Sequence, residues 1–493
     1  MGLKCVRVWL LLISMLISLQ GWRMEGCLEQ ERSALLQLKH FFNDPNRLQD
    51  WVEGHGNSDC CDWESVDCSF ETSRVSSLDL GFARNQELGE WYLNVSLLSP
   101  FQELKTLYLN GNLIAGCIEN EGFERLSHLN NFMDLDLSYN MFNDNRILPV
   151  SGLNNLKYLS LSDNMFNNSI LSYVSTLSSL KELNLTDIGL KGTVDLQELD
   201  SLINLEVLSM GGNEIEKVVI SKGETSLRNL TMLYLSNMSI SDGRSLLQTL
   251  SLFPSLEDVN FYYNNFSGAV NTYELSNFTN VREFLFSDSS LHISFLQSVG
   301  AFMSLDTLRM EDCEVSGELT DQELPTFKSL MKLDISNTIF NNNNSLQMLG
   351  SMTSLVYLSI VNCTFKNTSL DEGICKMPQL GRLIISGNGL TGTFPWWCVA
   401  NLTSLYQLDI SINSFTGHIP MEIGAYLSVL NSFNISRNAF EGSIPSSFGD
   451  MKSLMWLDMS NNLLTGGILE ELAGCISLQH LALSNNSLQG QIF

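Results

Sequence analysis

The amino-acid sequence predicts an α/β solenoid, in which many short coils stack along one axis. The evidence is a nine-residue pattern, leucine-x-x-leucine-x-leucine-x-x-asparagine, whose clearest copies begin at Leu104, Leu156, Leu405 and Leu454. With degenerate copies included, the pattern begins seventeen times, at residues 75, 104, 132, 156, 180, 205, 230, 256, 281, 305, 330, 355, 380, 405, 430, 454 and 478. Most copies are 24 or 25 residues apart. A constant period in this range indicates a leucine-rich-repeat superhelix of about 17 coils.

The spacing inside the pattern predicts a parallel β-sheet on the concave side of the solenoid. The fourth and sixth residues share one face of a strand, and with the first leucine they point into the core. The other strand residues face solvent. Because one coil cannot bury its own leucines, stability comes from contacts between neighbouring coils. A long exposed sheet of this kind is typical of a recognition module, so we expect a binding protein and not an enzyme.

The ninth residue of the pattern turns the chain out of the strand. An asparagine amide suits this position because it can donate to and accept from exposed backbone groups. Asparagine occurs there in ten copies: Asn112, Asn140, Asn164, Asn213, Asn264, Asn388, Asn413, Asn438, Asn462 and Asn486. In the middle of the chain the position holds Ile188, Met238, Ser289, Cys313, Thr338 and Cys363. Serine, threonine and cysteine can replace the amide as weaker hydrogen-bonding groups, whereas isoleucine and methionine cannot.

A second signature, of the form LxGxIP, follows several of these turns. Its clearest copies are Leu390–Pro395, Phe415–Pro420 and Phe440–Pro445. Glycine permits a tight bend, while the β-branched residue and the proline favour a short extended segment.

The sequence divides into three predicted segments: a signal peptide at residues 1–26, a cap at 27–74, and the solenoid at 75–493, which ends inside a repeat. Lys4 and Arg7 precede an apolar stretch, Val8–Leu19, as in a secretory signal. A signal anchor remains the alternative, although the apolar stretch is short for a membrane span.

Asparagine sequons support passage through the secretory pathway. Thirteen N-x-S/T sites are present: Asn94, Asn167, Asn184, Asn229, Asn237, Asn265, Asn277, Asn343, Asn362, Asn367, Asn401, Asn434 and Asn485. Asn184 and Asn434 fall between core positions of the strand, so a glycan there would lie on the concave face.

The cysteines divide into a cluster and scattered positions. Cys27, Cys60, Cys61 and Cys68 precede the repeats, and an oxidising compartment favours disulfides among them over a metal site. Cys375 and Cys398 are 23 residues apart, about one coil, so they could bridge neighbouring coils. The remaining cysteines of the repeats are expected to be buried thiols: Cys117, Cys313, Cys363 and Cys475.

The composition and the remaining motifs exclude several functions. A net charge of −27 argues against nucleic acid and is compatible with a basic ligand. The segment Gly387–Gly392 matches GxGxxG, but its glycines coincide with repeat turns and no βαβ unit surrounds them. The six histidines are scattered without metal or triad spacing. We therefore expect no cofactor and no catalytic residue.

The most chemically distinctive part of the predicted concave face belongs to the copies at 256, 281, 305 and 330. Acidic groups beside tyrosines suit a basic peptide, since aromatic rings supply contact area and carboxylates attract cations. The alternative is a solvated acidic face that binds nothing. The solvent-facing candidates are Glu257, Asp258, Tyr262, Tyr263, Arg282, Glu283, Asp288, Asp306, Arg309, Glu311, Asp312, Lys332 and Asp334.

The segments Cys27–Phe42 and Asp50–Cys68, with the LxGxIP turns, resemble plant extracellular leucine-rich-repeat receptor-like proteins. The resemblance covers nearly all of the chain after the signal. It implies plant-type coils and a cap stapled by disulfides Cys27–Cys60 and Cys61–Cys68. Such receptors perceive an extracellular peptide, protein or wall-derived ligand at the plasma membrane, lack a kinase, and signal through partner receptor kinases. This chain departs from the pattern at Phe493, where it stops without a closing cap or membrane helix.

The leading functional prediction is therefore the ligand-binding ectodomain of a kinase-less cell-surface receptor in plant defence or developmental signalling. Two alternatives remain open. One is a secreted inhibitor like the polygalacturonase-inhibiting proteins, which share the cap and repeats but are shorter. The other is a truncated fragment that does not signal.

Overall fold

The computed structural model describes residues 26–42, 47–53, 59–143, 150, 152–266, 280–300, 302–318, 327–343, 345–370, 372–468 and 470–490. All of the predicted signal peptide except residue 26 lies outside these ranges, as does the sequon at Asn277. The chain forms two compact units. The first comprises Met1–Gly189 and Glu198–Leu205, and the second Leu190–Gln197 and Glu206–Phe493.

In the first unit, the repeats contribute short strands to one sheet. Apart from β1, which pairs antiparallel with β2, adjacent strands run parallel and in register. The strands are β1 (Val66–Cys68), β2 (Val75–Asp79), β4 (Thr106–Tyr108), β6 (Asp134–Asp136), β7 (Tyr158–Ser160) and β8 (Glu182–Asn184). A separate parallel pair is formed by β3 (Trp91–Leu93) and β5 (Ile114–Cys117).

The second unit has the same architecture, and each of its repeats contributes one strand to the long sheet. Its long sheet consists of β10 (Val207–Ser209), β12 (Met232–Tyr234), β13 (Asp258–Tyr262), β15 (Glu283–Ser287), β17 (Thr307–Glu311), β19 (Lys332–Ser336), β21 (Tyr357–Val361), β23 (Arg382–Ile384), β25 (Gln407–Asp409), β27 (Ser432–Asn434), β29 (Trp456–Asp458) and β31 (His480–Ala482). These strands also pair in parallel. Each of the seventeen predicted copies thus carries a strand of a long sheet, which confirms the predicted solenoid.

Shorter strands form further parallel sheets in the second unit. One pair is β9 (Lys191–Asp195) and β11 (Glu214–Val219), and one sheet is β14 (Asn265–Phe266), β16 (Ser290–His292), β18 (Glu314–Ser316), β20 (Ile339–Phe340) and β22 (Thr364–Phe365). The LxGxIP segments and their degenerate copies form β24 (Thr391–Thr393), β26 (Ser414–His418), β28 (Ala439–Ser443), β30 (Leu463–Gly467) and β32 (Ser487–Gln489). The extended segments predicted after the turns are therefore present.

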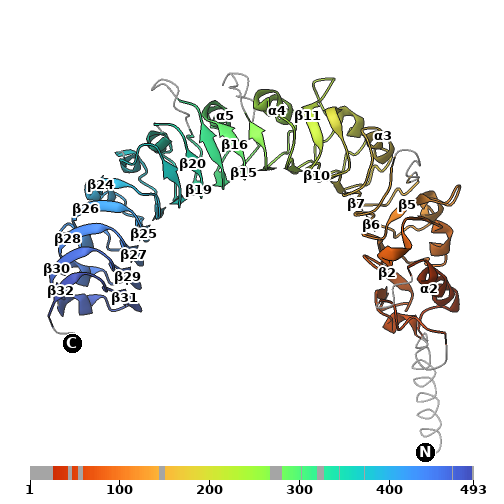
Figure 1. Cartoon of the computed structure of the whole chain (residues 1–493), viewed down its shortest axis with the longest axis horizontal. Coiled ribbons are helices and arrows are strands. Elements are labelled where there is room, and N and C mark those ends of the chain that lie inside the picture. Colours follow the sequence, from red (N-terminus) through yellow and green to blue (C-terminus); the bar gives the residue numbers. More distant parts are fainter. Residues whose placement is uncertain are drawn as a thin grey trace, which may run out of the picture. The chain divides into compact units, whose positions relative to one another are not determined.

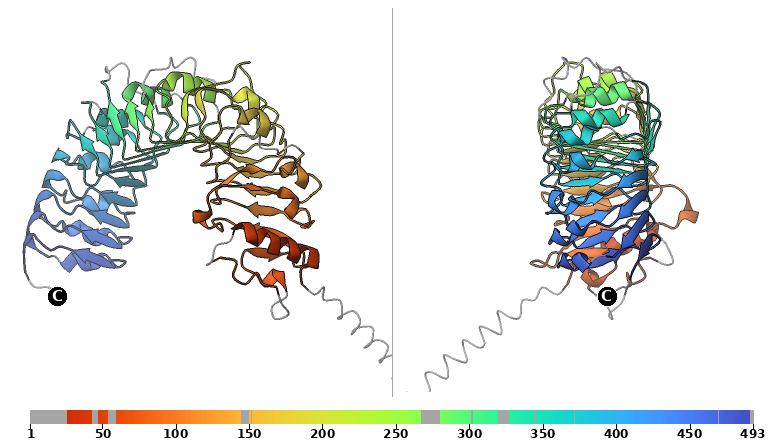
Figure 2. Two further views of the ribbon diagram at one scale, coloured as in Figure 1. Left: turned by 45° about the vertical axis from the view of Figure 1, so that its right-hand side comes forward. Right: turned by 90° about the vertical axis from the view of Figure 1, so that its left-hand side faces the viewer.

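Within each unit, helices cover the side of the coils opposite the long sheet (Figures 1 and 2). The α-helices are α2 (Glu29–Phe42), α3 (Ile170–Val174), α4 (Gly243–Leu250), α5 (Ile293–Val299), α6 (Trp396–Val399) and α7 (Ile423–Tyr426). Among the described residues, short 3₁₀ helices occupy Cys60–Asp62, Gln86–Leu88, Val95–Leu98, Phe123–Leu126, Leu196–Leu199, Ser345–Ser351, Glu372–Lys376, Ser446–Asp450 and Glu470–Gly474. None of the helices in the described ranges has both the length and the apolar character needed to cross a bilayer.

The asparagines at the ninth position form a hydrogen-bonded ladder between coils. Asn140 Nδ2 donates to the carbonyl of Leu137 in its own coil and to that of Leu109 in the preceding coil, each at 3.0 Å. Its Oδ1 accepts from the amides of Asn112 and Ile114 at 3.1 and 2.9 Å. The amide therefore satisfies backbone groups that the turn would otherwise leave buried and unpaired.

The replacements in the middle of the ladder hydrogen-bond more sparsely, as predicted. Ser289 Oγ donates to the carbonyl of Ser287 at 2.8 Å and accepts from the Asn264 amide at 3.0 Å. Cys363 Sγ lies 3.5 Å from the carbonyl oxygen of Val361. Burial raises the pKa of both the Cys313 and the Cys363 thiol to about 11, so these side chains remain neutral.

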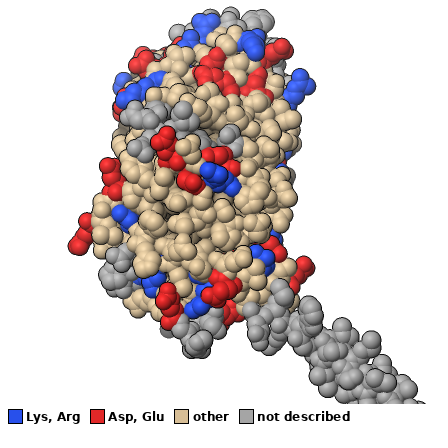
Figure 3. All heavy atoms as spheres, turned by 90° about the vertical axis from the view of Figure 1, so that its right-hand side faces the viewer, with Lys and Arg blue, Asp and Glu red and all other residues tan. Residues whose placement is uncertain are grey.

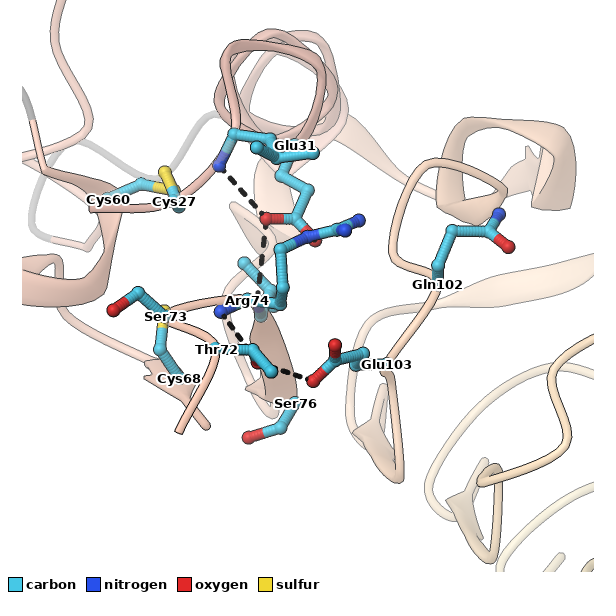
Figure 4. Close-up of polar contacts among 12 residues, drawn as sticks. Cys27, Glu31, Cys60, Cys68, Thr72, Ser73, Arg74, Ser76, Gln102 and Glu103 are labelled. Carbon is cyan, nitrogen blue, oxygen red and sulfur yellow. Dashed lines mark hydrogen bonds and ion pairs between the residues drawn. A yellow bond between two sulfur atoms is a disulfide. The ribbon is translucent and has the colours of Figure 1, made fainter. Parts of the chain in front are cut away.

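The cap is held together by disulfides and by a buried ion pair. Disulfides join Cys27 to Cys60 and Cys61 to Cys68, as the resemblance implied, and a third joins Cys375 to Cys398 in the second unit. Glu31 in α2 is fully buried, and its Oε1 lies 2.9 Å from Arg74 Nε (Figure 4). Thr72 Oγ1 donates to Glu103 Oε2 at 2.6 Å. Polar links thus run from the cap helix to the second repeat.

Candidate ligand-binding surface

Strands β13, β15, β17 and β19 each have five residues, whereas most strands of the long sheets have three. Their alternate residues point to solvent and line up across the sheet. One row consists of Asp258, Glu283, Thr307 and Lys332, and another of Asn260, Leu285, Arg309 and Asp334. Because neighbouring strands are about 4.8 Å apart, side chains in one row touch or nearly touch.

The predicted candidates all lie on this part of the second unit, and none of them is buried. We call this set the acidic strand surface: Glu257, Asp258, Tyr262, Tyr263, Arg282, Glu283, Asp288, Asp306, Arg309, Glu311, Asp312, Lys332 and Asp334. It carries eight carboxylates and three cationic side chains. Charged residues make up 16% of the whole chain, and the face drawn in Figure 3 is mostly uncharged.

The placement of some candidates differs from the expectation that they lie on strands. Tyr263, Asp288 and Asp312 follow their strands and adopt left-handed backbone conformations, with φ of 55°, 49° and 50°. Glu257 and Asp306 immediately precede β13 and β17. The sequence pattern counted these residues as strand positions because it does not reveal where the pairing stops.

Two ion pairs lie within the acidic strand surface. Arg309 Nε is 2.8 Å from Glu283 Oε1, and Arg282 Nη2 is 3.0 Å from Asp306 Oδ2. Both pairs connect the coils at 281 and 305. Two of the eight carboxylates are therefore already compensated by a neighbouring cation.

Asp258 lies close to three other carboxylates, those of Glu257, Glu283 and Asp306. Burial raises the pKa of its carboxyl above the ordinary value of 3.8, and repulsion by Glu283, Glu257 and Asp306 raises this pKa further. Arg282 opposes the shift only in part. A cation placed near Asp258 would therefore relieve existing repulsion.

The two tyrosines differ in how much ring they offer. Tyr262 ends β13 and is half-buried, whereas the side chain of Tyr263 is 62% exposed. Only Tyr263 therefore presents most of its ring to a ligand.

The sequence reading missed Tyr357, which extends the first row onto β21. Its ring centroid lies 5.1 Å from Lys332 Nζ and 5.2 Å from the guanidinium carbon of Arg382. Tyr357 and Arg382 continue the register of Lys332. Tyr357 and Arg382 occupy the same position in the copies at 355 and 380 that Asp258 and Glu283 occupy in theirs. The repeat pattern therefore contains the signal that identifies both residues.

The two sequons predicted to lie on the concave sheets, Asn184 and Asn434, are at strand positions of the long sheets. Asn184 ends β8 and Asn434 ends β27, and both are half-buried. Asn434 Nδ2 donates to Asp409 Oδ2 at 3.1 Å, so the nitrogen that would carry a sugar is engaged. Occupancy of all thirteen sequons remains a prediction.

Within the described ranges, no group of three histidine, cysteine, aspartate or glutamate side chains is arranged to hold a metal ion. The acidic strand surface is an open sheet of charged and aromatic side chains, a geometry suited to contact with another molecule.

Comparison with known proteins agrees with this architecture. Residues 28–69 match the leucine rich repeat N-terminal domain, and residues 403–464 and 428–488 match the leucine rich repeat. The chain is a leucine-rich-repeat protein. Its relatives include plant receptor-like proteins.

One relative is Cuscuta receptor 1 of Solanum lycopersicum, 30% identical over 262 residues, which cover 52% of this chain and 22% of the relative. Receptor-like protein 14 of Arabidopsis thaliana is 36% identical over 154 residues, covering 29% of this leucine-rich-repeat chain and 15% of the relative. The matched regions thus span about a fifth or less of the length of these relatives.

Among solved structures, a similar one is the ectodomain of the Arabidopsis thaliana membrane receptor kinase GASSHO1/SCHENGEN3, in complex with CASPARIAN STRIP INTEGRITY FACTOR 2. It has a TM-score of 0.51 and 22% identity, and the alignment covers 93% of this chain and 62% of that one. This likeness establishes the fold alone.

Proposed function

We propose that this chain is the ligand-recognising ectodomain of a kinase-less plant cell-surface receptor. The observation that carries the proposal is the acidic strand surface. It combines uncompensated carboxylates with an exposed tyrosine, on and directly beside five-residue strands of the long sheet. The receptor-like relatives support the class of protein.

The proposed ligand is a cationic extracellular peptide or a basic protein segment. An extended peptide would lie across β13, β15, β17 and β19, with its lysines or arginines near Glu257 and Asp258. Carboxylates would speed its approach, and Tyr263 would supply contact area. Asp334 and Glu311 would contact its other end.

Signalling would need a partner, because the proposed receptor has no kinase of its own. We propose a receptor kinase at the plasma membrane, with the repeats on the extracellular face. Disulfides and sequons fit the oxidising secretory route that this location requires.

The proposal is tested by expressing the chain in plant cells with a carboxy-terminal tag and screening the secreted protein against extracellular peptides. We expect at least one cationic peptide to bind with micromolar or lower Kd, and neutral peptides of the same length to bind at least tenfold more weakly. Retention in the cytoplasm, or equal affinity for neutral and acidic peptides, would contradict the proposal. Inhibition of a fungal polygalacturonase by the same protein would favour the secreted-inhibitor alternative.

A further inference from the structure

A second exposed aromatic surface lies on the first unit. Phe82 and Tyr139 follow β2 and β6, and each side chain is 55% exposed. Their ring centroids are 6.2 Å apart and the ring planes are inclined by 44°. The backbones of Phe82, Gly111 and Tyr139 stand in successive coils, linked by amide hydrogen bonds to the next coil.

These two aromatic residues occupy a position that most coils give to other residue types. The first residue of the turn has a left-handed backbone, which glycine, asparagine and aspartate adopt most readily. Twelve of the seventeen coils have one of these there: Gly111, Asp163, Asp187, Gly212, Asn237, Asp288, Asp312, Asn337, Asn362, Gly387, Asn461 and Asn485. Phe82 and Tyr139 adopt φ of 52° and 53°. A large aromatic residue is strained in this conformation, and an exposed ring recovers little of that cost by burial.

The Phe82 ring lies over Gly111 and contacts the Tyr139 ring. A Cβ atom at Gly111 would lie 2.3 Å from Cδ1 of Phe82, so any side chain there would displace the ring. A hollow beside the two rings has a volume of about 570 Å³ and is lined by Phe82, Arg84, Asn85, Gln86, Gly111, Leu113 and Tyr139. This volume falls in the range of small-ligand sites.

Hydrogen-bonding groups border the rings. Gln86 is exposed and lines the hollow, and its amide nitrogen donates to the Gly111 carbonyl at 3.2 Å. The Tyr139 hydroxyl hydrogen-bonds the Asp163 carboxylate in the next coil. Apolar ring faces surrounded by amides and a carboxylate match a pyranose, which has apolar C–H faces and a rim of hydroxyls.

The charge of the site selects among sugars. Arg84 is only 7% exposed, and its guanidinium donates to the carbonyls of Gly89 and Phe41. Asp163 and Asp187 follow in the next two coils and are negative. With the cation engaged and two carboxylates nearby, an acidic sugar would be repelled.

We propose that the hollow beside the Phe82 and Tyr139 rings binds an uncharged oligosaccharide. The exposed faces of the two rings stack on pyranose faces, and the side chains of Asn85 and Gln86 hydrogen-bond the sugar hydroxyls. This site is independent of the peptide surface on the second unit.

The test is isothermal titration calorimetry of the secreted chain, with its own N-glycans trimmed, against cellohexaose and N-acetylchitohexaose. The variants are Phe82→Asn and Tyr139→Asn, because asparagine suits the left-handed backbone and removes the ring. Gly111→Asn displaces the Phe82 ring, because its Cβ would lie 2.3 Å from Cδ1 of that ring. Tyr263→Asn is the matched control, since it removes an exposed tyrosine from the same turn position on the second unit.

We expect one of the two sugars to bind, and each of Phe82→Asn, Tyr139→Asn and Gly111→Asn to weaken binding at least tenfold, with an unchanged melting temperature for Phe82→Asn and Tyr139→Asn. Tyr263→Asn should bind like the wild type. Absence of binding at millimolar sugar, an equal loss in Tyr263→Asn, or binding of decaproline in place of either sugar would overturn the proposal. None of these results depends on whether a cationic peptide binds the second unit.

Discussion

Arg309 Nε lies 2.8 Å from Glu283 Oε1, across the adjacent parallel strands β17 and β15. The pair Arg282–Asp306 connects the same two coils in the opposite sense, at 3.0 Å. The acidic strand surface is therefore uneven: Glu283 and Asp306 are ion-paired, while Glu257 and Asp258 in the preceding coil have no ion-pair partner among the described residues. This unevenness decides which substitutions should affect binding and which should not.

Glu283→Gln should change stability very little. The side chains of Glu283 and Arg309 are 31% and 44% exposed. Exposed ion pairs contribute roughly 0.2–1 kcal/mol to the free energy of unfolding. A double-mutant cycle of Glu283→Gln and Arg309→Gln, followed by denaturant unfolding, should give a coupling of less than about 1 kcal/mol. A coupling of several kcal/mol would mean that the pair is far less solvated than its exposure indicates.

Binding of a cationic peptide should strengthen as the pH rises through the mildly acidic range. The pKa of Asp258 is raised above its ordinary value, so part of this carboxyl is protonated at pH values where a free aspartate is ionised. A bound cation lowers that pKa, so binding releases a proton and the affinity rises with pH. Calorimetry at about pH 4.5, 5.5 and 6.5 tests this, with Asp258→Asn expected to flatten the dependence. Tighter binding at the lowest pH would argue against a cationic ligand beside Asp258.

Asn140→Ala should destabilise the first unit by about 3 kcal/mol, because it leaves several buried backbone groups of two coils without partners. Thermal unfolding and hydrogen exchange of the coils at 104 and 132 measure the loss. Asn130→Ala, an exposed asparagine between the same coils, is the control and should unfold like the wild type. Similar behaviour of the two variants would show that the ladder is dispensable.

Much of this fold follows from the sequence because one rule repeats. Leu104, Leu107 and Leu109 are at most 1% exposed, as the period-two alternation requires, and Asn112 takes the turn position. The disulfides of the cap could also be predicted, because the resemblance to plant receptor-like proteins implied their pairing. The division into two units was not expected, since the pattern continues through the boundary without a linker.

The candidate surface was only partly predictable. Repeat positions identify which residues face solvent, but ion pairing depends on side-chain direction between coils, so Arg309–Glu283 could not be read from spacing. The left-handed turns at Tyr263 and Asp288 were also missed, because the pattern does not show where strand pairing ends. Phe82 and Tyr139 were not predicted to be neighbours, because they lie 57 residues apart in the sequence and their rings meet across two coil steps.

Arg74→Leu should destabilise the cap by about 3–5 kcal/mol, because it leaves the fully buried Glu31 carboxylate without a cation. Glu31 also accepts from the amides of Leu28 and Val75. Adding Glu31→Gln should restore most of the loss, since glutamine removes the charge and keeps an acceptor for those amides. Thermal unfolding measures both variants. Failure of the double variant to recover would place the effect in packing and not in charge.

The central claim is that the uncompensated carboxylates beside β13 recognise a cationic peptide. Its most direct test is the Kd of the peptide selected in the screen, measured for the wild type, for Glu257→Gln/Asp258→Asn, and for Glu216→Gln, an exposed acid on β11. We predict that the double variant binds about 10- to 100-fold more weakly, with a slower association rate and less salt dependence, while Glu216→Gln is unchanged. A double variant whose Kd stays within twofold of the wild type would contradict the account.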